Sequence, residues 1–193
     1  MDKIKRAFAL FDDYNKKDPV QVVVDDIEYP KEYFFSQKMY EWILKLRPEP
    51  SEALLLASRC QHIGRWEIPR TDYPEGKAGY LRWRSDLAKY HAEKAGSILQ
   101  ESGFDRDLIE QVKQIVLKKQ IKLNPDVQVI EDALCLVFLQ FEYEDFIKKH
   151  DDLKLIRILQ KTWAKMSEQG HAAALNLQYS AKGRALIERA LAG

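Results

Sequence analysis

The sequence predicts an all-α fold with one short extended segment near the N-terminus. Apolar residues recur at spacings of three and four along nearly the whole chain, which places them on one face of successive helices. β-Branched residues are concentrated in a single short stretch. With 193 residues, 46% of them hydrophobic and only eight glycines, the chain can bury one sizeable core. We therefore expect a single domain over residues 1–193.

The first part of the chain predicts three helices. Apolar residues between Ile4 and Tyr14, and again between Tyr33 and Leu46, follow the helical spacing. The third helix carries the leucine run that begins at Leu54, and Ser51 ahead of it is a typical N-cap. Two prolines separate the second and third helices, so we expect a tight corner between them.

Two segments interrupt the helical pattern. Residues 18–30, DPVQVVVDDIEYP, are rich in β-branched side chains and flanked by prolines, which predicts an extended arm or a short strand. Residues 64–79, GRWEIPRTDYPEGKAG, contain two prolines and three glycines without a sustained period. We expect a long loop there, and such loops in compact domains are often functional.

Further helices are expected over the rest of the chain. One helix is expected to stop at the Ser-Gly pair 102–103, and NPD at 124–126 opens another. An amphipathic segment follows, and the last twenty residues add a short helix. The expected ranges are 80–101, 105–120, 124–146 and 151–170.

The charge balance limits the kind of partner. The 31 basic and 30 acidic side chains give a formal net charge of +1, whereas a nonspecific nucleic-acid binder carries a strong positive field. Any basic site must therefore be local, and the near-neutral charge argues against a nucleic-acid partner.

The sequence predicts a cytoplasmic protein without a membrane segment. The stretch after Met1 leads into an amphipathic segment and lacks the pattern of a secretory leader. The longest apolar run, residues 133–141, is too short to span a bilayer. Cys60 and Cys135 both lie inside apolar helical patterns, where reduced core thiols are expected.

Three side chains are the first candidates for chemistry. His62 ends an apolar helical run. His91 follows Arg84 by seven residues, so His91 and Arg84 lie on one face of their helix. Asp132 is a carboxylate in an otherwise apolar helix, and a buried carboxylate needs an ion-pair partner or a metal. An imidazole or an arginine would serve, and spacing does not choose between them. A lone histidine is also compatible with an ordinary structural role.

Three stretches of the chain resemble a known superfamily. They are ALLLASRCQHIG (53–64), HAEKAGSILQESGFDRDLIEQVKQIV (91–116) and VIEDALCLVFL (129–139). In this order they are similar to segments of the HD-domain superfamily, which are all-α, metal-dependent phosphohydrolases. The resemblance covers roughly Lys31 to Phe146 and implies a single HD-like helical bundle.

The chain departs from that superfamily at its metal ligands. Gln61 stands where the paired histidine is expected, and His62 stands where the aspartate is expected. Gln37 or a neighbour occupies the place of the first histidine, and Lys118 or Lys119 the region of a further one. Amide oxygens bind divalent cations weakly and ammonium groups repel them, so a tight dinuclear site is not expected.

What the resemblance leaves is a reduced catalytic set. It implies that His62, His91 and Asp132 hold at most one weakly bound divalent metal or activate water directly, with Gln61 beside them. These four residues are the expected catalytic group.

A closer resemblance extends over nearly the whole chain. RCQHIGRWEIPR (59–70), GYLRWR (79–84), EDALCLVFLQ (131–140) and KTWAKMS (161–167) are similar to domain-of-unknown-function family 4202, some of whose members carry a glutamyl-tRNA synthetase-like label. This resemblance implies that the Gln-His pair is a family trait. It does not supply an activity.

Basic and aromatic side chains form a second group of candidates, which would converge on the two histidines if the packing is HD-like. Guanidinium groups bind phosphate in bidentate fashion and indole rings stack on bases. The alternative is that the arginines pair with nearby acids on a solvated loop while the tryptophans fill the core. The expected ligand-binding residues are Arg59, Arg65, Trp66, Arg70, Arg82, Arg84, Lys118 and Lys119.

Two functional hypotheses follow. The first is an HD-like protein with a cationic His/Arg pocket for a phosphorylated small molecule or nucleotide, and phosphoester hydrolysis is the reaction expected if the protein is an enzyme. The second is a non-catalytic module that senses a ligand or docks a protein after loss of the HD metal site. RNA contact through the same basic loop is a third possibility, and the near-neutral net charge argues against it.

Overall fold

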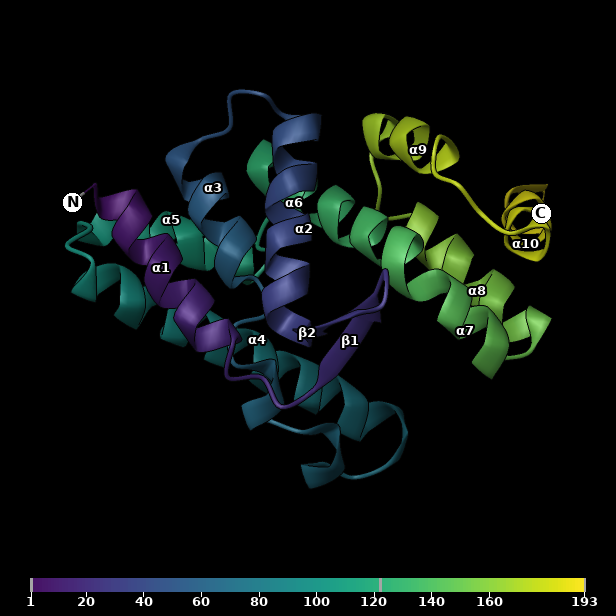
Figure 1. Cartoon of the computed structure of the whole chain (residues 1–193), viewed down its shortest axis with the longest axis horizontal. Coiled ribbons are helices and arrows are strands. Elements are labelled where there is room, and N and C mark those ends of the chain that lie inside the picture. The colour runs from purple at the N-terminus through teal and green to yellow at the C-terminus, as the bar shows by residue number, and fades with distance from the viewer. Residues whose placement is uncertain (1, 122, 193) are drawn as a thin grey trace.

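The computed structural model of the protein describes residues 2–121 and 123–192 (Figure 1). Within those residues the chain forms ten α-helices and one two-stranded antiparallel sheet, so the mostly α single domain that the periodicity predicts is confirmed. The helices are α1 (Lys3–Asn15), α2 (Lys31–Leu46), α3 (Glu52–Cys60), α4 (Gly76–Glu101), α5 (Arg106–Val116), α6 (Pro125–Val137), α7 (Tyr143–Lys149), α8 (Asp152–Trp163), α9 (Glu168–Leu175) and α10 (Ala181–Ala192).

Helix starts follow the local signals in the sequence. The Ser51 side chain accepts a hydrogen bond from the Leu54 N–H at 3.0 Å, which caps α3 as predicted. Asp105 caps α5 in the same way, accepting from Leu108 N–H at 2.9 Å. At α6 the Asn124 side chain caps the helix and proline occupies the first helical position.

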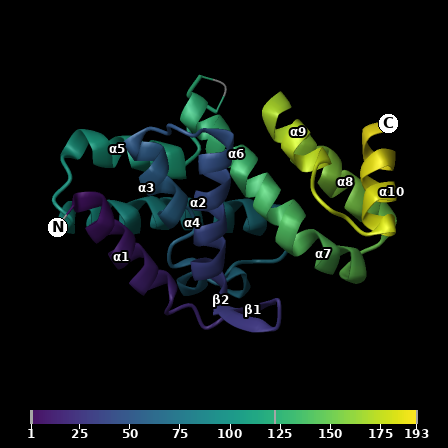
Figure 2. The same cartoon turned by 45° about the horizontal axis from the view of Figure 1, so that its top comes forward.

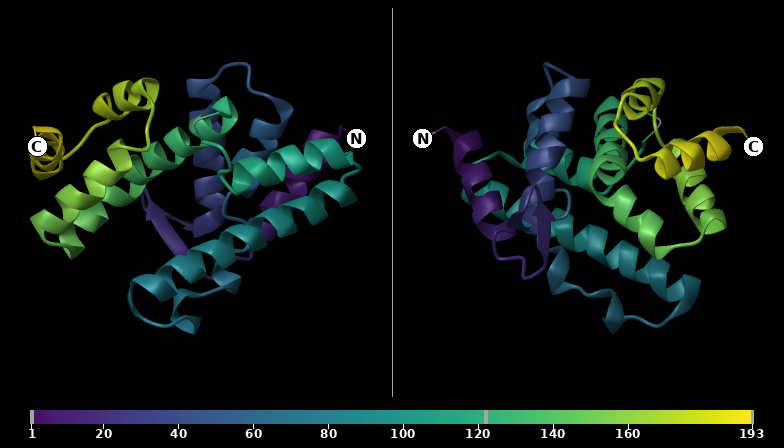
Figure 3. Two further views of the ribbon diagram at one scale, coloured as in Figure 1. Left: turned by 180° about the vertical axis from the view of Figure 1, so that it is seen from behind. Right: turned by 45° about the vertical axis from the view of Figure 1, so that its right-hand side comes forward.

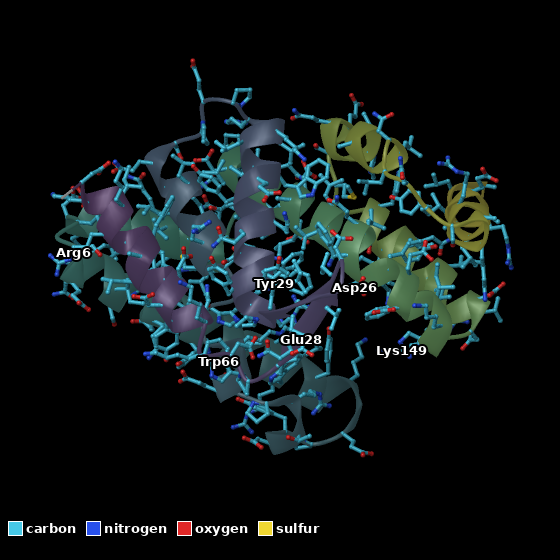
Figure 4. The ribbon with its side chains drawn as sticks, in the orientation of Figure 1. Arg6, Asp26, Glu28, Tyr29, Trp66 and Lys149 are labelled. Atoms are coloured by element: carbon cyan, nitrogen blue, oxygen red, sulfur yellow. The ribbon has the colours of Figure 1, made fainter. Side chains whose placement is uncertain are left out.

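The predicted extended segment is a β-hairpin. Strand β1 (Gln21–Val24) pairs with β2 (Ile27–Pro30), and both turn residues, Asp25 and Asp26, have positive φ angles of 52° and 62°. A two-residue turn of this kind matches the twist of the two strands. Figure 4 shows Asp26 at the tip of this hairpin and Tyr29 on the strand that returns to α2.

The helices are arranged around α2 and α6. Helix α2 stands at the centre of Figure 1 and packs against α3 and α6. Seen from behind, α4 runs below them and α5 packs along it (Figure 3). Helices α8, α9 and α10 gather at the end of the molecule opposite the N-terminus (Figure 2). The fully buried side chains at the centre include Ile43, Leu54, Leu56, Leu99, Ile130 and Leu136.

Several element boundaries differ from the predicted ones. The segment 64–79 is shorter as a loop than expected, because α4 already begins at Gly76 and two 3-10 turns, Arg65–Glu67 and Arg70–Asp72, fill the rest. The expected helix 105–120 ends at Val116. The expected helix 124–146 is interrupted by a π turn over Phe138–Glu142, and the expected helix 151–170 is divided between α8 and α9. Among the described helices, none has the length and apolar character needed to cross a bilayer.

Candidate functional site

A cavity of about 550 Å³ lies between α2, α4 and the α6–α8 region. Helix α4 contributes one face, on which Tyr80, Arg84 and His91 recur at helical spacing. Helix α6 contributes another, on which Glu131 and Leu134 are three residues apart. Small-molecule sites in proteins occupy cavities of this size, so this cavity is the candidate functional site.

The two predicted histidines meet in the cavity. His62 lies in the turn after α3 and His91 in the middle of α4, and their ring centroids are 5.6 Å apart. His91 Nδ1 lies 2.7 Å from the Ile63 carbonyl oxygen, which requires Nδ1 to carry the proton and donate it. His91 Nε2 is buried and has no hydrogen-bond partner among the described residues. It therefore offers an unused acceptor at the site.

Both imidazoles are neutral near pH 7. Burial lowers the pKa of His91 to about 4. Burial also lowers the pKa of His62 well below its usual value, and the positive charge of Arg65 adds to that effect. Their role at neutral pH is that of hydrogen-bond acceptors or bases.

Glu32 is a site residue that the sequence analysis missed. The Asp18 carboxylate accepts hydrogen bonds from Val20 N–H and Glu32 N–H, both at 2.9 Å, and so ties the hairpin to the start of α2. The Glu32 carboxylate lies 3.8 Å from His62 Nδ1 and 3.8 Å from Arg65 Nε. Burial raises the pKa of Glu32 to about 7, against the lowering effect of Arg65.

A sequence signal for Glu32 did exist. Glu32 precedes Phe35 by three residues and Met39 by seven, so it lies on the inward face of its helix, and all three line the cavity. The site thus contains a carboxyl group that changes protonation near neutral pH.

Lys118, Lys165 and Glu131 form a partly buried charge cluster. Lys118 Nζ lies 2.6 Å from Glu131 Oε2, and Lys165 Nζ lies 3.6 Å from Glu131 Oε1. Burial lowers the pKa of Lys118 despite the neighbouring carboxylate. Although burial would raise it, the two ammonium groups hold the pKa of Glu131 below its usual value. One carboxylate therefore sits between two cations.

Lys118 occupies a backbone position that usually belongs to glycine. Its φ angle is 55°, in the left-handed region. Lys118 N–H donates to Ile115 O at 2.9 Å and Lys119 N–H to Gln114 O at 3.0 Å, which is the hydrogen-bond pattern of a Schellman ending for α5. The strained position directs the Lys118 side chain into the cavity, whereas Lys119 is exposed and does not line it.

Cations outnumber carboxylates in the cavity. Five cationic side chains and three carboxylates line it. Within residues 2–121 and 123–192, Arg84 has no carboxylate within ion-pair distance, and its guanidinium donates only to the Tyr80 hydroxyl at 3.3 Å. The cations are Lys31, Arg65, Arg84, Lys118 and Lys165, and the carboxylates are Glu32, Glu131 and Glu142.

Asp132 does not join the two histidines, which corrects the convergence that the sequence predicted. Asp132 Oδ1 accepts from Ser167 N–H at 2.8 Å and from the Gln128 amide at 3.0 Å, and Oδ2 accepts from the Ser167 hydroxyl at 2.5 Å. The physical reason is helical geometry, because neighbouring positions point about 100° apart. Glu131 faces the cavity, and Asp132 faces the start of α9.

The residues present do not fit the metal set that the HD resemblance implies. In the part of the chain that the structure describes, no three His, Cys, Asp or Glu side chains are placed to hold a metal ion together. Gln61 lines the cavity, but its amide N–H donates to Val116 O at 3.0 Å. With Asp132 turned away, His62 and His91 are left without the expected third ligand.

Arg59, an expected ligand-binding residue, lies away from the cavity. Its guanidinium is 2.5 Å from the Asp12 carboxylate and also donates to Gln37. It lies over the rings of Phe8 and Tyr40, with centroids at 5.1 and 5.4 Å. These contacts join α1, α2 and α3, so this arginine has partners within the fold.

Four other expected residues also lie outside the cavity, whereas Arg65, Arg84 and Lys118 line it. Arg70 donates to carbonyl groups of its own loop, at 2.8 and 2.9 Å. Arg82 and Lys119 are exposed. Trp66 packs on Tyr14 with ring centroids 5.8 Å apart, at the end of α1 (Figure 4).

Fold and site together define a mostly α single-domain protein with a basic cavity that contains two neutral histidines. The family model described as a domain of unknown function (DUF4202) matches residues 5–187, and the chain therefore belongs to that family. Searches of curated proteins and of solved structures found no match.

Proposed function

We propose that the cavity binds a phosphorylated small molecule, a class that includes nucleotides. The observation that carries the proposal is the excess of cationic side chains over carboxylates in a cavity of ligand size. Protonation of Glu32, whose pKa is about 7, increases that excess near neutral pH. An anionic ligand would balance the charge.

The phosphate is proposed to bind between Arg84 and Lys118. Arg84 has no carboxylate partner among the described residues, and its charge reaches both Lys118 and Glu131, whose pKa values it lowers. An arginine fork binds two phosphate oxygens at once, and a lysine supplies a point charge beside it. Lys165, on the other side of Glu131, lies next to this position.

A second candidate function, hydrolysis of the bound phosphoester, is favoured by His91 and Glu32. The free His91 Nε2 would accept a proton from a water molecule as the oxygen of that water forms a bond to phosphorus. Glu32 exchanges a proton near pH 7 and would protonate the leaving oxygen as the phosphorus–oxygen bond breaks. In this proposal the chain is a divergent HD-like phosphohydrolase; if only binding occurs, it is a ligand-sensing module.

The binding proposal is tested by titration calorimetry with AMP and inorganic phosphate. We expect Arg84→Gln and Lys118→Met to weaken AMP binding at least tenfold. Arg82→Gln and Lys119→Met are matched controls, since each removes one charge from an exposed neighbour that does not line the cavity. Equal losses in the control variants, or binding of neither compound, would overturn the proposal.

Turnover is tested separately by phosphate release from p-nitrophenyl phosphate and a panel of nucleotides. Release that is lost in Glu32→Gln, while AMP affinity is kept, supports hydrolysis. AMP binding without release of phosphate from any compound supports the sensing module and removes the hydrolytic proposal.

A further inference from the structure

One wall of the cavity is apolar and accessible. Leu134 on α6, Phe138 in the π turn, Phe146 on α7 and Ile158 on α8 all line the cavity, and all four remain half-buried. The rings of Phe138 and Phe146 pack perpendicular to each other, with centroids 5.2 Å apart. We refer to these four residues as the apolar wall. It gives the cavity an uncovered hydrocarbon surface that a ligand can bury.

The apolar wall begins beside the cationic cluster. Leu134 follows Glu131 by three residues and Phe138 follows it by seven, so the three lie along one helical face. At a rise of about 1.5 Å per residue this face extends roughly 10 Å from Glu131 to Phe138. Lys118 and Lys165 flank Glu131 at the other end. The cavity therefore has a charged end and an apolar end roughly 10 Å apart, which is the length of a small molecule.

Three polar groups next to the apolar wall each have one partner within the protein. The Thr162 hydroxyl donates to Ile158 O at 2.9 Å. The Cys135 thiol points at Thr162 O at 3.9 Å. Lys31 is paired with Glu142 at 3.0 Å. The four side chains of the apolar wall have no donor or acceptor, so sugar hydroxyls or a base edge placed against them would lose hydrogen bonds to water without regaining them.

These contacts point to a ligand with two unlike ends. We infer that the cavity selects a phosphate monoester whose body is a hydrocarbon or aryl group, with the phosphate near Arg84 and Lys118 and the body on the apolar wall. The inference rests on the proposed function and narrows it from phosphorylated molecules in general to one class. Nucleotides and sugar phosphates become the weaker ligands.

Calorimetric titration with four compounds that share the phosphate group tests the inference. The compounds are n-hexyl phosphate, phenyl phosphate, ribose 5-phosphate and inorganic phosphate. We expect the hexyl and phenyl esters to bind at least tenfold more tightly than ribose 5-phosphate. Ile158→Ser is expected to weaken hexyl phosphate binding about tenfold and to leave ribose 5-phosphate binding unchanged.

Two further variants guard against an effect on folding. Ile158→Thr is a milder change at the same position. Leu153→Ser is the matched control on the same helix, because Leu153 is 66% exposed and does not line the cavity. Melting temperatures of all three variants show whether a binding loss comes from unfolding.

The outcomes separate this inference from the proposed function. If ribose 5-phosphate binds as tightly as hexyl phosphate, or if Leu153→Ser lowers binding as much as Ile158→Ser does, the inference is overturned and phosphate binding stands. If none of the four compounds binds to the folded protein, the proposed function itself fails.

Discussion

The junction of α1, α2 and α3 and the cavity both contain arginines that the sequence places in one basic group, but the two regions balance charge differently. At the junction, Arg59 has a carboxylate partner in Asp12 at 2.5 Å and two aromatic rings around it. In the cavity, Arg84 has no such partner among the described residues. A buried cation with partners from its own chain stabilises the fold, whereas cations in excess around a cavity favour an anion from outside.

The largest expected effect on stability is at the junction of α1, α2 and α3, where Arg59 pairs with Asp12. Asp12→Ala leaves the Arg59 guanidinium, whose side chain is only 9% exposed, without its counter-charge. Removal of one partner from a buried pair is strongly destabilising, and we expect a loss of about 3 kcal/mol in the free energy of unfolding, measured by urea denaturation. AMP affinity of the folded protein should stay unchanged. A loss below about 0.5 kcal/mol would show that Arg59 behaves like a surface arginine.

The second prediction concerns pH and the unbalanced region. Because the pKa of Glu32 is raised from 4.5 to about 7 in the folded state, the folded protein binds more protons than the unfolded chain between these values. Stability from this group is complete below pH 4.5 and is lost as the pH rises through 7. The free energy of unfolding of Glu32→Gln minus that of the wild type should therefore rise by about 2 kcal/mol as the pH is raised from 5 to 8.

Folding lowers the pKa values of His62 and His91, whereas it raises that of Glu32. The contribution of the histidines to the pH dependence of stability must therefore be separated from that of Glu32. Their lowered pKa values remove stability as the pH falls below about 6.5. Since both histidines are present in the wild type and in Glu32→Gln, subtracting the two denaturation series at each pH isolates the carboxyl group. A difference that does not change with pH would contradict the raised pKa.

A third prediction separates two adjacent acids on α6. Asp132→Ala removes the acceptor of the Ser167 N–H and hydroxyl hydrogen bonds at the start of α9. We expect a loss of about 2 kcal/mol in the free energy of unfolding and no change in AMP affinity. Loss of AMP binding at unchanged stability would instead restore the role that the HD resemblance implies for Asp132.

The features that the sequence predicts well are those that depend on residues close together in the chain. Helix starts such as the Ser51 cap were readable because the capping groups lie within three residues of each other. The helical segments are predictable from their apolar periodicity for a similar reason, because the repeating residues are only three or four positions apart. The resemblance to the HD-domain superfamily implies that His62 and His91 meet, and their ring centroids do lie 5.6 Å apart.

The errors concern contacts between distant segments. Asp132 and Glu131 share one apolar helix, and only the packing of α9 decides which of them faces the cavity. Arg59 finds its partner 47 residues earlier in the chain. The spacing of Glu32 to Phe35 and Met39 predicts its face of α2, but it does not predict the Asp18 carboxylate, 14 residues earlier, that accepts the Glu32 N–H and ties the hairpin to the start of that helix. Spacing gives the face of a helix but not the element that covers it.

The smallest expected effect on stability concerns two residues with left-handed backbone angles, of which only Lys118 lines the cavity. Gln120 has a φ angle of 58° and an exposed side chain, and Lys118 has a φ angle of 55° and a side chain in the cavity. Glycine relieves the backbone strain at either position, so Gln120→Gly should gain about 1 kcal/mol in the free energy of unfolding. Lys118→Gly should gain less, because Glu131 then keeps only Lys165, and AMP affinity should fall at least tenfold in this variant alone. Equal gains in stability with unchanged affinity in both variants would mean that Lys118 contributes neither to the ion pair with Glu131 nor to AMP binding.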